Sequence, residues 1–325
     1  MLSIVIVNWK TCGHLRRCLQ SLETHGLGAE MQVIVVDNAS GDGSAEMVAA
    51  EFPCIRLIAL DRNVGYAEGN NVGIAAALNT TGVESEGQDF ILTLNPDVEF
   101  FDDSLGIAVD EMLNRPDVGA MGIRLVDPDG VTTQASIRSF PRPSAIVPEM
   151  LGLSRLLPSV FGRYRMHGFD YSKSQEIEQP MGTFVLYRVA ALSDTSFRPE
   201  RSGVEESRSQ RSLDFARDDV VADPGPFDPQ FPIFFNEVDL LQRIANAGWK
   251  IWYCAEARLK HHGGASTRQV RQPMIWESHR SLVRYYRKWY YRWWNAPLFW
   301  LFAGLVYLGA FVRARGWSEG FKPSN

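Results

Sequence analysis

The stretch Phe90-Ile91-Leu92-Thr93-Leu94-Asn95-Pro96-Asp97 decides the fold class of this chain. It opens with a short, nearly continuous apolar run, and a proline follows soon after, which predicts a buried β-strand and not a helix. A parallel α/β sheet binds its ligands beyond the carboxyl ends of its strands. The run therefore predicts that Asp97 lies at the edge of a sheet, with a second acid, Glu99, close behind. A carboxylate at that place can hold a divalent metal ion against a diphosphate.

Other strand-like runs precede this one and alternate with segments that have a helical spacing of apolar residues. The strand-like runs are Leu2 to Asn8, Gln32 to Asp37, Ile55 to Leu60 and Phe90 to Leu94. The order βαβαβαβ predicts an α/β protein with a mostly parallel, doubly wound sheet. Each run ends in polar residues, so polar side chains gather along one edge of the sheet, where a nucleotide would lie.

The composition is that of an ordinary globular protein: of 325 residues, 45% are hydrophobic and 22% are charged. The net charge of -5 gives no general attraction to polyanions, so we expect no nucleic-acid partner. The cysteines are scattered without metal-ligand spacing, which predicts neither a zinc site nor disulfides and favours a reducing compartment. The chain opens directly into a strand without a basic leader, so we expect the catalytic part in the cytoplasm.

The segment after the first strand, Asn8-Trp9-Lys10-Thr11-Cys12-Gly13, carries no G-x-G-x-x-G pattern. A P-loop is missing as well. Both patterns bind phosphates through glycine-rich turns at the start of a helix. Their absence removes support for dinucleotide oxidoreduction and for ATP hydrolysis.

The rest of the chain is less regular. Gly119 to Val131 predicts a further strand and a turn, and the proline-rich stretch Pro141 to Arg165 predicts loops or short helices over the acceptor side. From Arg198 to Asp219, 11 of 22 residues are charged, which indicates a solvated or disordered insertion. A helix around Asp239 to Ala247 and a strand at Lys250 to Cys254 are then expected, separated by a glycine C-cap.

Seven motifs stand in a fixed order along roughly residues 1 to 290. They are Ile4-Val5-Ile6-Val7-Asn8-Trp9, Val36-Asp37-Asn38-Ala39-Ser40-Gly41-Asp42-Gly43-Ser44, Asn63-Val64-Gly65-Tyr66-Ala67-Glu68-Gly69-Asn70-Asn71, Leu94-Asn95-Pro96-Asp97, Gly182-Thr183-Phe184, Phe235-Asn236-Glu237-Val238-Asp239-Leu240 and His261-His262-Gly263-Gly264-Ala265-Ser266. In this order they resemble glycosyltransferase family 2, and within it the bacterial rhamnosyltransferases. The resemblance implies a GT-A fold, a nucleotide-diphosphate sugar donor, a Mg²⁺ or Mn²⁺ ion and inversion at the anomeric carbon.

The resemblance implies donor-binding roles for residues at the ends of the predicted strands. These residues are Val7, Asn8, Asp37, Asn63, Gly65, Asn71, Asn95 and Gly182. Asp37 would contact the base or the ribose. By residue type alone, the asparagines and glycines fit ordinary turns equally well, and Asp37 fits a helix cap or a turn.

Asp97 corresponds to the last acid of the family's DxD motif, whose first position is Asn95 in this chain. One firm carboxylate remains, which suits a hard cation that keeps waters and shares the donor phosphates. His261 corresponds to the family histidine near the metal and the diphosphate, where it would ligate the metal or balance charge. The glycines that follow predict that the histidine lies in a flexible loop over the phosphates.

An acceptor hydroxyl is barely acidic at neutral pH, so a positioned carboxylate has to take its proton as it attacks. Glu237 stands where the family usually has its catalytic aspartate, and it is the first candidate for this base. Asp239, two residues later, is the second candidate. It also fits a stabilising acid at the N-terminus of a helix.

Basic and aromatic residues interleave from Arg280 to Trp294, and an uncharged run from Ala296 to Val312 follows. Aromatic residues beside basic ones suit a lipid headgroup region. The run is shorter than the roughly 20 residues of a membrane span, so an interfacial helix, a short anchor and a buried amphipathic helix all stay open. A membrane-bound acceptor, such as a polyprenyl-diphosphate-linked saccharide, would explain a membrane-associating segment.

These observations predict two parts. Residues 1–275 would form the GT-A domain, with a nucleotide-sugar half at 1–130, an acceptor half at 131–275 and the insertion at about 195–224; residues 276–325 would form a helical membrane-associating segment. We expect a metal-dependent, inverting hexosyltransferase that takes a dTDP- or UDP-sugar, such as a rhamnose donor. It would act on the cytoplasmic face of the membrane in polysaccharide synthesis. A nucleotidyltransferase and a catalytically inactive nucleotide-binding scaffold are the alternatives.

Overall fold

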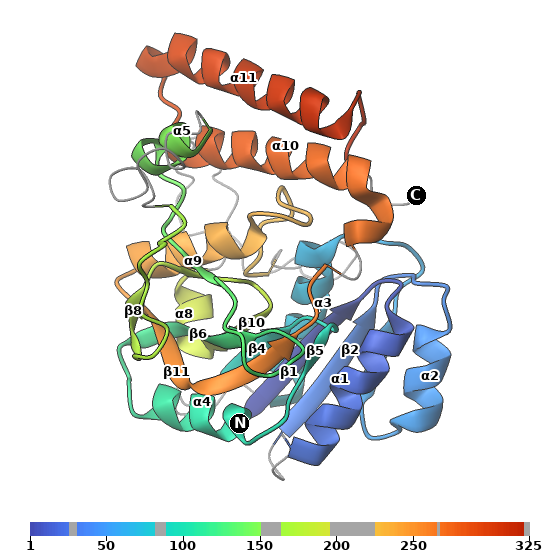
Figure 1. Cartoon of the computed structure of the whole chain (residues 1–325). Coiled ribbons are helices and arrows are strands. Elements are labelled where there is room, and N and C mark those ends of the chain that lie inside the picture. Colours follow the sequence, from blue (N-terminus) through green and yellow to red (C-terminus); the bar gives the residue numbers. More distant parts are fainter. Residues whose placement is uncertain (26–30, 82–88, 151–163, 196–224, 265–266, 322–325) are drawn as a thin grey trace, which may run out of the picture.

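The computed structural model describes residues 1–25, 31–81, 89–150, 164–195, 225–264 and 267–321. These residues form a mixed α/β domain around a central sheet, and two long C-terminal helices lie across one side of it (Figure 1). The strand order in the described sheet is β3-β2-β1-β4-β10-β6-β11-β5, with β8 beside β11. The predicted α/β class with a mostly parallel sheet is confirmed.

The first part of the sheet is parallel. It contains β1 (Leu2–Asn8), β2 (Met31–Asp37), β3 (Arg56–Ala59) and β4 (Phe90–Leu94), connected by α1 (Cys12–His25), α2 (Ser44–Glu51) and α3 (Tyr66–Thr81). Alternate residues of β1 pack on opposite faces of the sheet, because side chains alternate along a strand. Ile4 and Ile6 pack in the core of α1 and α2, whereas Val5 and Val7 face α3. Helices on both faces explain why these strands are apolar throughout.

α3 approaches β1 closely because two of its residues are glycines. A Cβ on Gly73 would lie 2.3 Å from Cγ1 of Val5, and a Cβ on Gly69 would lie 2.9 Å from Cγ1 of Val7. Larger residues would push the helix off the sheet. This contact fixes the N-terminal end of α3, and with it Tyr66, at the carboxyl edge of β1.

The second part of the sheet is mixed. β6 (Val118–Val126) and β11 (Lys250–His261) are parallel; β10 (Phe184–Arg188) is antiparallel to β4 and β6; β5 (Val98–Glu99) and β8 (Gln175–Ile177) are antiparallel to β11. A small separate sheet pairs β7 (Ile137–Arg138) with β9 (Gln179–Pro180). The helices of this part are α4 (Ser104–Leu113), α5 (Pro143–Met150), α8 (Val189–Asp194) and α9 (Asn236–Asn246).

Two predictions about this part are wrong. The strand expected at Lys250 to Cys254 continues to His261, because a register shift between Cys254 and Arg258 lets the chain rejoin β6. His261 is therefore held in a strand and does not lie in a flexible loop. The insertion predicted at about 195–224 lies outside the described residues, apart from Thr195.

The two C-terminal helices are α10 (Arg271–Trp289), which follows η1 (Thr267–Val270), and α11 (Ala296–Ala314), which follows η2 (Trp293–Asn295). α11 runs back along α10, and α10 lies between α11 and the sheet domain (Figure 1). The domain boundary predicted between residues 275 and 276 falls inside α10. Nζ of Lys288 lies 2.7 Å from a carboxylate oxygen of Asp228 and 2.8 Å from one of Asp239, and both acids are fully buried. α10 is thus joined to the domain by buried ion pairs.

α11 buries one stripe of side chains against its neighbours and exposes the rest. The buried residues are Phe299, Ala303, Val306 and Ala310. In the part of the chain that the structure describes, one helical segment, Trp293–Ala314, is long and apolar enough to cross a membrane by length and composition. Only 22% of its most apolar window is buried.

Candidate active site

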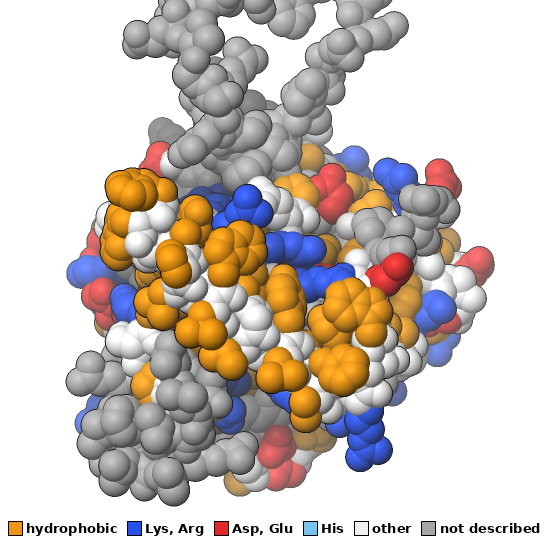
Figure 2. All heavy atoms as spheres, turned by 90° about the horizontal axis from the view of Figure 1, so that it is seen from above, with side chains coloured by type: hydrophobic (Ala, Val, Ile, Leu, Met, Phe, Trp, Pro, Cys, Tyr) orange, Lys and Arg blue, Asp and Glu red, His pale blue; other side chains and the backbone are white. Residues whose placement is uncertain are grey.

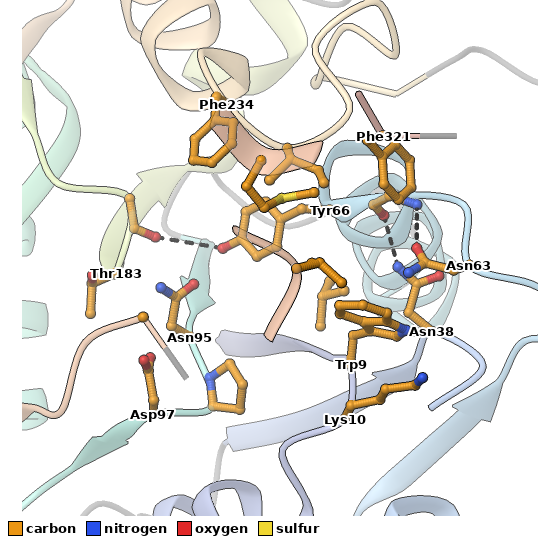
Figure 3. A pocket seen from close by; sticks show the side chains of 18 of the residues that line it. Trp9, Lys10, Asn38, Asn63, Tyr66, Asn95, Asp97, Thr183, Phe234 and Phe321 are labelled. Atoms are coloured by element: carbon orange, nitrogen blue, oxygen red, sulfur yellow. Dashed lines mark hydrogen bonds between the residues drawn. The ribbon is translucent and has the colours of Figure 1, made fainter. Parts of the chain in front are cut away.

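A cavity of about 760 Å³ opens at the carboxyl ends of β1 and β4, a size typical of small-molecule sites. Most of the site residues predicted from the sequence line it: Val7, Asn63, Gly65, Asn95, Asp97, Gly182, Glu237 and His261. Figure 3 shows Asp97 and Asn95 at one end of this cavity and Asn38 and Asn63 at the other. The remaining predicted residues, Asn8, Asp37, Asn71 and Asp239, are not among the residues that line it.

Asp97 and His261 are far apart in the sequence and meet because β5 pairs with the end of β11. His261 stands opposite Val98, and the N–H of His262 donates to the carbonyl oxygen of Asp97 at 2.9 Å. Nε2 of His261 then lies 3.8 Å from Oδ1 of Asp97, and both side chains are buried. This distance is too long for a hydrogen bond. It suits two ligands of one cation, since atoms about 2.0–2.1 Å from an ion lie at most about 4.2 Å apart.

The hydrogen bonds of Gln134 determine which ring nitrogen of His261 carries the proton. Nε2 of Gln134 donates to Oδ1 of Asp127 at 2.8 Å and to the carbonyl oxygen of His261 at 2.9 Å, so the amide oxygen faces the imidazole. That oxygen only accepts, and it lies 2.9 Å from Nδ1 of His261. Burial lowers the pKa of His261, although the charge of Asp97 opposes this shift. The neutral ring therefore holds its proton on Nδ1 and presents the lone pair of Nε2 to the cavity.

The donor set at this end fits a hard divalent cation that binds together with phosphate groups. Among the described residues, no three Asp, Glu, His or Cys side chains gather as a metal cluster. One carboxylate and one imidazole leave most coordination positions to water and to oxygens of the ligand. Mg²⁺ is commonly bound in this way, through one or two carboxylates and substrate phosphates.

The other end of the cavity is formed by the loops that follow β2 and β3. Nδ2 of Asn38 donates to the carbonyl oxygen of Gly65 at 3.1 Å, and its Oδ1 accepts from the N–H of Val64 at 2.8 Å. Oδ1 of Asn63 accepts from the N–H of Gly65 at 2.9 Å. Gly65 has a φ of 94°, and a Cβ there would lie 2.9 Å from the carbonyl oxygen of Pro232, so glycine is required. The result is a rigid polar end, suited to a nucleoside.

Asn8 and Asp37 form a buried network behind this end of the cavity. Nδ2 of Asn8 donates to Oδ1 of Asp37 at 2.9 Å. The hydroxyl of Ser40 donates to the same oxygen at 2.6 Å, and the N–H of Ser40 donates to Oδ2 at 3.1 Å. Asn71 is also buried, with its amide bonded to both backbone groups of Phe227. These residues support the cavity walls, and their direct contact with a donor stays a prediction.

Glu237 lies in the first turn of α9 and faces Gly182. A Cβ on Gly182 would lie 3.1 Å from Cγ of Glu237, so the glycine leaves the room that this side chain occupies. Glu237 is half-buried in the cavity wall, and desolvation raises the pKa of its carboxyl group to about 7. A carboxyl group that ionises near neutral pH beside a cavity is suited to general base catalysis.

Asp239, the second candidate base, points into the interface between α9 and α10. Its side chain is fully buried and accepts from Nε of Arg243 at 3.0 Å, from Nζ of Lys288 at 2.9 Å and from Nε1 of Trp289 at 2.9 Å. These donors satisfy the carboxylate and hold two helices together. The geometry therefore favours Glu237 over Asp239 as the base.

The cavity also contains residues that were not predicted from the sequence. Trp9, Asn38 and Tyr66 stand inside the quoted motifs, so their neighbours could have pointed to them. Met274 and Phe321 come from the C-terminal segment and have no local signal, because only the packing of α10 and the residues after α11 brings them to the cavity.

The chain belongs to glycosyl transferase family 2, whose sequence profile matches residues 3–195. It is therefore a glycosyltransferase, and the resemblance seen in the motifs is confirmed. This membership removes the support for the nucleotidyltransferase alternative.

The chain is similar along almost its whole length to a Mycobacterium tuberculosis protein, N-acetylglucosaminyl-diphospho-decaprenol L-rhamnosyltransferase. The two are 27% identical over 97% of this chain and 93% of the relative. This chain is also 24% identical to the O-antigen biosynthesis protein RfbC of Myxococcus xanthus. The match spans 85% of this chain and 18% of RfbC.

Two solved structures share the fold. The mannosyltransferase PcManGT from Pyrobaculum calidifontis, in complex with GDP-Man and Mn²⁺, matches 97% of this chain and 74% of its own with a TM-score of 0.51 and 14% identity. GalNAc-T7 with UDP, GalNAc and Mn²⁺ matches 80% of this chain and 43% of its own with a TM-score of 0.50 and 11% identity. At these identities the likeness shows the fold alone, and it confirms the predicted GT-A fold.

Proposed function

We propose that this glycosyltransferase moves a sugar, rhamnose above all, from a nucleoside diphosphate donor to a saccharide on a polyprenyl diphosphate, with inversion and with Mg²⁺ or Mn²⁺. The observation that carries the proposal is one cavity with the Asp97–His261 pair, Glu237 and a polar nucleoside end in its walls. The choice of sugar and acceptor rests on the mycobacterial relative, which is similar over nearly the whole chain.

Asp97 and His261 would hold the cation at the diphosphate. A divalent cation there would stabilise the negative charge that develops on the phosphate oxygens as the nucleoside diphosphate leaves. His261 contributes through the lone pair on Nε2, which Gln134 keeps directed to the cavity. The protein thus prepares the site for a leaving group that gains negative charge.

Glu237 would accept the proton of the acceptor hydroxyl. As the hydroxyl oxygen forms its bond to the anomeric carbon, the bond from that carbon to the diphosphate oxygen breaks, and the proton passes to the carboxylate. One such displacement inverts the configuration and needs no covalent intermediate with the enzyme. General base catalysis of this kind contributes about 10²–10⁴-fold.

The exposed face of α11 supports peripheral attachment to a membrane. Figure 2 looks onto this side of the molecule and shows hydrophobic side chains spread over it, with Lys and Arg among them. The exposed apolar residues of the helix include Leu298, Trp300, Leu301, Leu305, Leu308, Phe311 and Val312. Exposed Trp293 and Trp294 precede them, and exposed Arg292 and Arg313 lie near the two ends. We expect the exposed apolar side chains to enter the membrane interface, with the basic residues at anionic headgroups. Attachment to the cytoplasmic face of the membrane would place the site close to a lipid-linked acceptor.

The test measures donor binding and transfer with the full chain. Calorimetry with dTDP, UDP and GDP, with and without Mn²⁺, should show metal-dependent binding of one of them, and Asp97→Asn should lose the metal-dependent part. Transfer from dTDP-rhamnose to a polyprenyl-diphosphate N-acetylglucosamine should follow, and the product should have the inverted anomeric configuration by NMR. A folded protein that binds none of these nucleotides would support the inactive-scaffold alternative instead.

A further inference from the structure

The residues that follow α11 turn back along α10 and are held there. The indole N–H of Trp276 in α10 donates to the carbonyl oxygen of Gly316 at 3.0 Å. The rings of Trp276 and Trp317 lie 4.4 Å apart, and the guanidinium of Arg280 lies 5.8 Å and 5.7 Å from these two ring centres. We call residues 316–321 the C-terminal tail. These contacts set its path toward the cavity.

Gly320 lets the tail pass close to α10. Its φ is 76°, and a Cβ there would lie 2.8 Å from Nη1 of Arg280 and 2.9 Å from Oε2 of Glu277. Glu277 is buried, and its other oxygen accepts from Nη1 of Arg284 at 2.5 Å. The backbone of Gly320 thus packs closely against the buried Glu277. The next side chain, that of Phe321, lies in the cavity wall.

The ring of Phe321 forms part of the nucleoside end of the cavity. It lines the cavity together with Asn63 and Gly65, and its Cε1 lies 3.3 Å from where a Cβ on Gly65 would be. In Figure 3, Asn38 and Asn63 lie between Phe321 and Trp9, whose indole lines the same end. Two aromatic rings with amide groups between them suit a nucleobase, which has an apolar face and a hydrogen-bonding edge.

We propose that Phe321 is a donor-binding residue whose ring contacts the nucleobase, so that the C-terminal tail completes the donor site. This inference rests on the proposed nucleoside diphosphate donor. It also links the donor site to the proposed membrane-facing helix, since the tail begins two residues after the last residue of α11. An aromatic ring stacked on a base contributes an amount of binding that corresponds to about 5- to 150-fold in affinity.

The test compares Phe321→Ala, Phe321→Leu and Phe321→Trp with the wild-type full chain by calorimetry with UDP and dTDP in the presence of Mn²⁺. Phe321→Ala should weaken both nucleotides by about 5- to 150-fold. Phe321→Trp, which keeps an aromatic face, should bind close to wild type, and Phe321→Leu should fall between the two. Inorganic pyrophosphate, which has no base, should bind equally to all four proteins.

Two results would overturn the inference while leaving the proposed function intact. One is the same nucleotide affinity in Phe321→Ala and wild type. The other is an equal loss for pyrophosphate and nucleotide, since this would show a general effect on the site and not a contact with the base. Failure of wild type itself to bind any nucleoside diphosphate would overturn the proposed donor class, and this inference with it. Melting temperatures of the variants check that each protein is folded.

Discussion

Nδ1 of His261 donates a hydrogen bond to Oε1 of Gln134 across 2.9 Å, and this contact orients a histidine at the Asp97 end of the cavity. The amide of Gln134 cannot turn over without losing its bonds to Asp127 and to the backbone of His261. The lone pair of Nε2 therefore stays directed to the cavity. Gln134 lies after β6, in a region whose local pattern predicts no site residue.

Gln134→Leu should lower the affinity for Mn²⁺ by about 10–100-fold, the usual effect of removing a group that orients a metal-binding histidine. The measurement is Mn²⁺ binding in the presence of UDP, followed by electron paramagnetic resonance. Asp127→Asn is the matched control, because its side-chain oxygen can still accept from Gln134. Unchanged Mn²⁺ affinity in a folded Gln134→Leu protein would contradict this role of Gln134.

Glu237→Gln should bind the donor as wild type does and lose about 10²–10⁴-fold in transfer rate, since it cannot accept a proton. In wild type, kcat/KM should rise with pH around the pKa of about 7, because only the ionised carboxylate is a base. Initial rates from pH 5.5 to 8.5 measure both effects. If Glu237→Gln transfers sugar at a normal rate, the base is another residue.

Glu237 should also make stability depend on pH. Its pKa is raised from 4.5 to about 7 in the folded protein, so the folded state binds the proton more tightly than the unfolded state. The contribution of this carboxyl group to the free energy of unfolding is fully present below pH 4.5 and is lost as the pH rises through about 7. Glu237→Gln should therefore gain in melting temperature relative to wild type between pH 5 and pH 8, by roughly 2–4 °C for each kcal/mol of the penalty removed. A constant difference across this range would show that the carboxyl group titrates normally.

Asp239 should matter for stability and not for chemistry. Asp239→Ala leaves the partly buried charges of Lys288 and Arg243 with fewer partners, and it should destabilise the fold by up to about 3–5 kcal/mol. Urea unfolding measures this loss. Under conditions where the variant is folded, its donor affinity should equal that of wild type. A stable Asp239→Ala protein without transfer activity would instead make Asp239 a catalytic residue.

Replacing Leu301, Leu305 and Leu308 together by serine should abolish most binding to vesicles that contain anionic lipid. Each leucine loses about 1.5–3 kcal/mol of burial in the bilayer interface. Co-flotation with phosphatidylcholine and phosphatidylglycerol vesicles gives the bound fraction. Ile107 and Leu113 on α4 are also exposed apolar residues, and their replacement by serine is the matched control. Equal flotation of both variants and wild type would exclude α11 as the membrane-binding surface.

The local sequence was enough to place the strands of the first part of the sheet and the loop that carries Asp97. Apolar runs such as Leu2–Asn8 and Phe90–Leu94 are strands because buried parallel strands need apolar residues on both faces. The turn expected within Gly119 to Val131 is also present, since Gly130 has a φ of 76° and its N–H bonds to the carbonyl oxygen of Asp127. The order of the seven motifs along the chain was enough to indicate the family.

Local sequence could not separate Glu237 from Asp239, because both are acids in the first turn of one helix. Which of them faces the cavity depends on the side of α9 that packs on α10. The strand that ends at His261 was also predicted too short, because the register shift inside β11 interrupts the local pattern.

What the sequence by itself determined is the order and type of the elements, the family and the acids that could do the chemistry. The resemblance assigned Asp97 and His261 to one metal, whereas only the tertiary structure brought Gln134 to His261 and Phe321 to Gly65. The physical reason is that periodicity and turn residues act over a few neighbouring positions, whereas these contacts depend on the register of β5 against β11 and on how α10, α11 and the C-terminal tail pack.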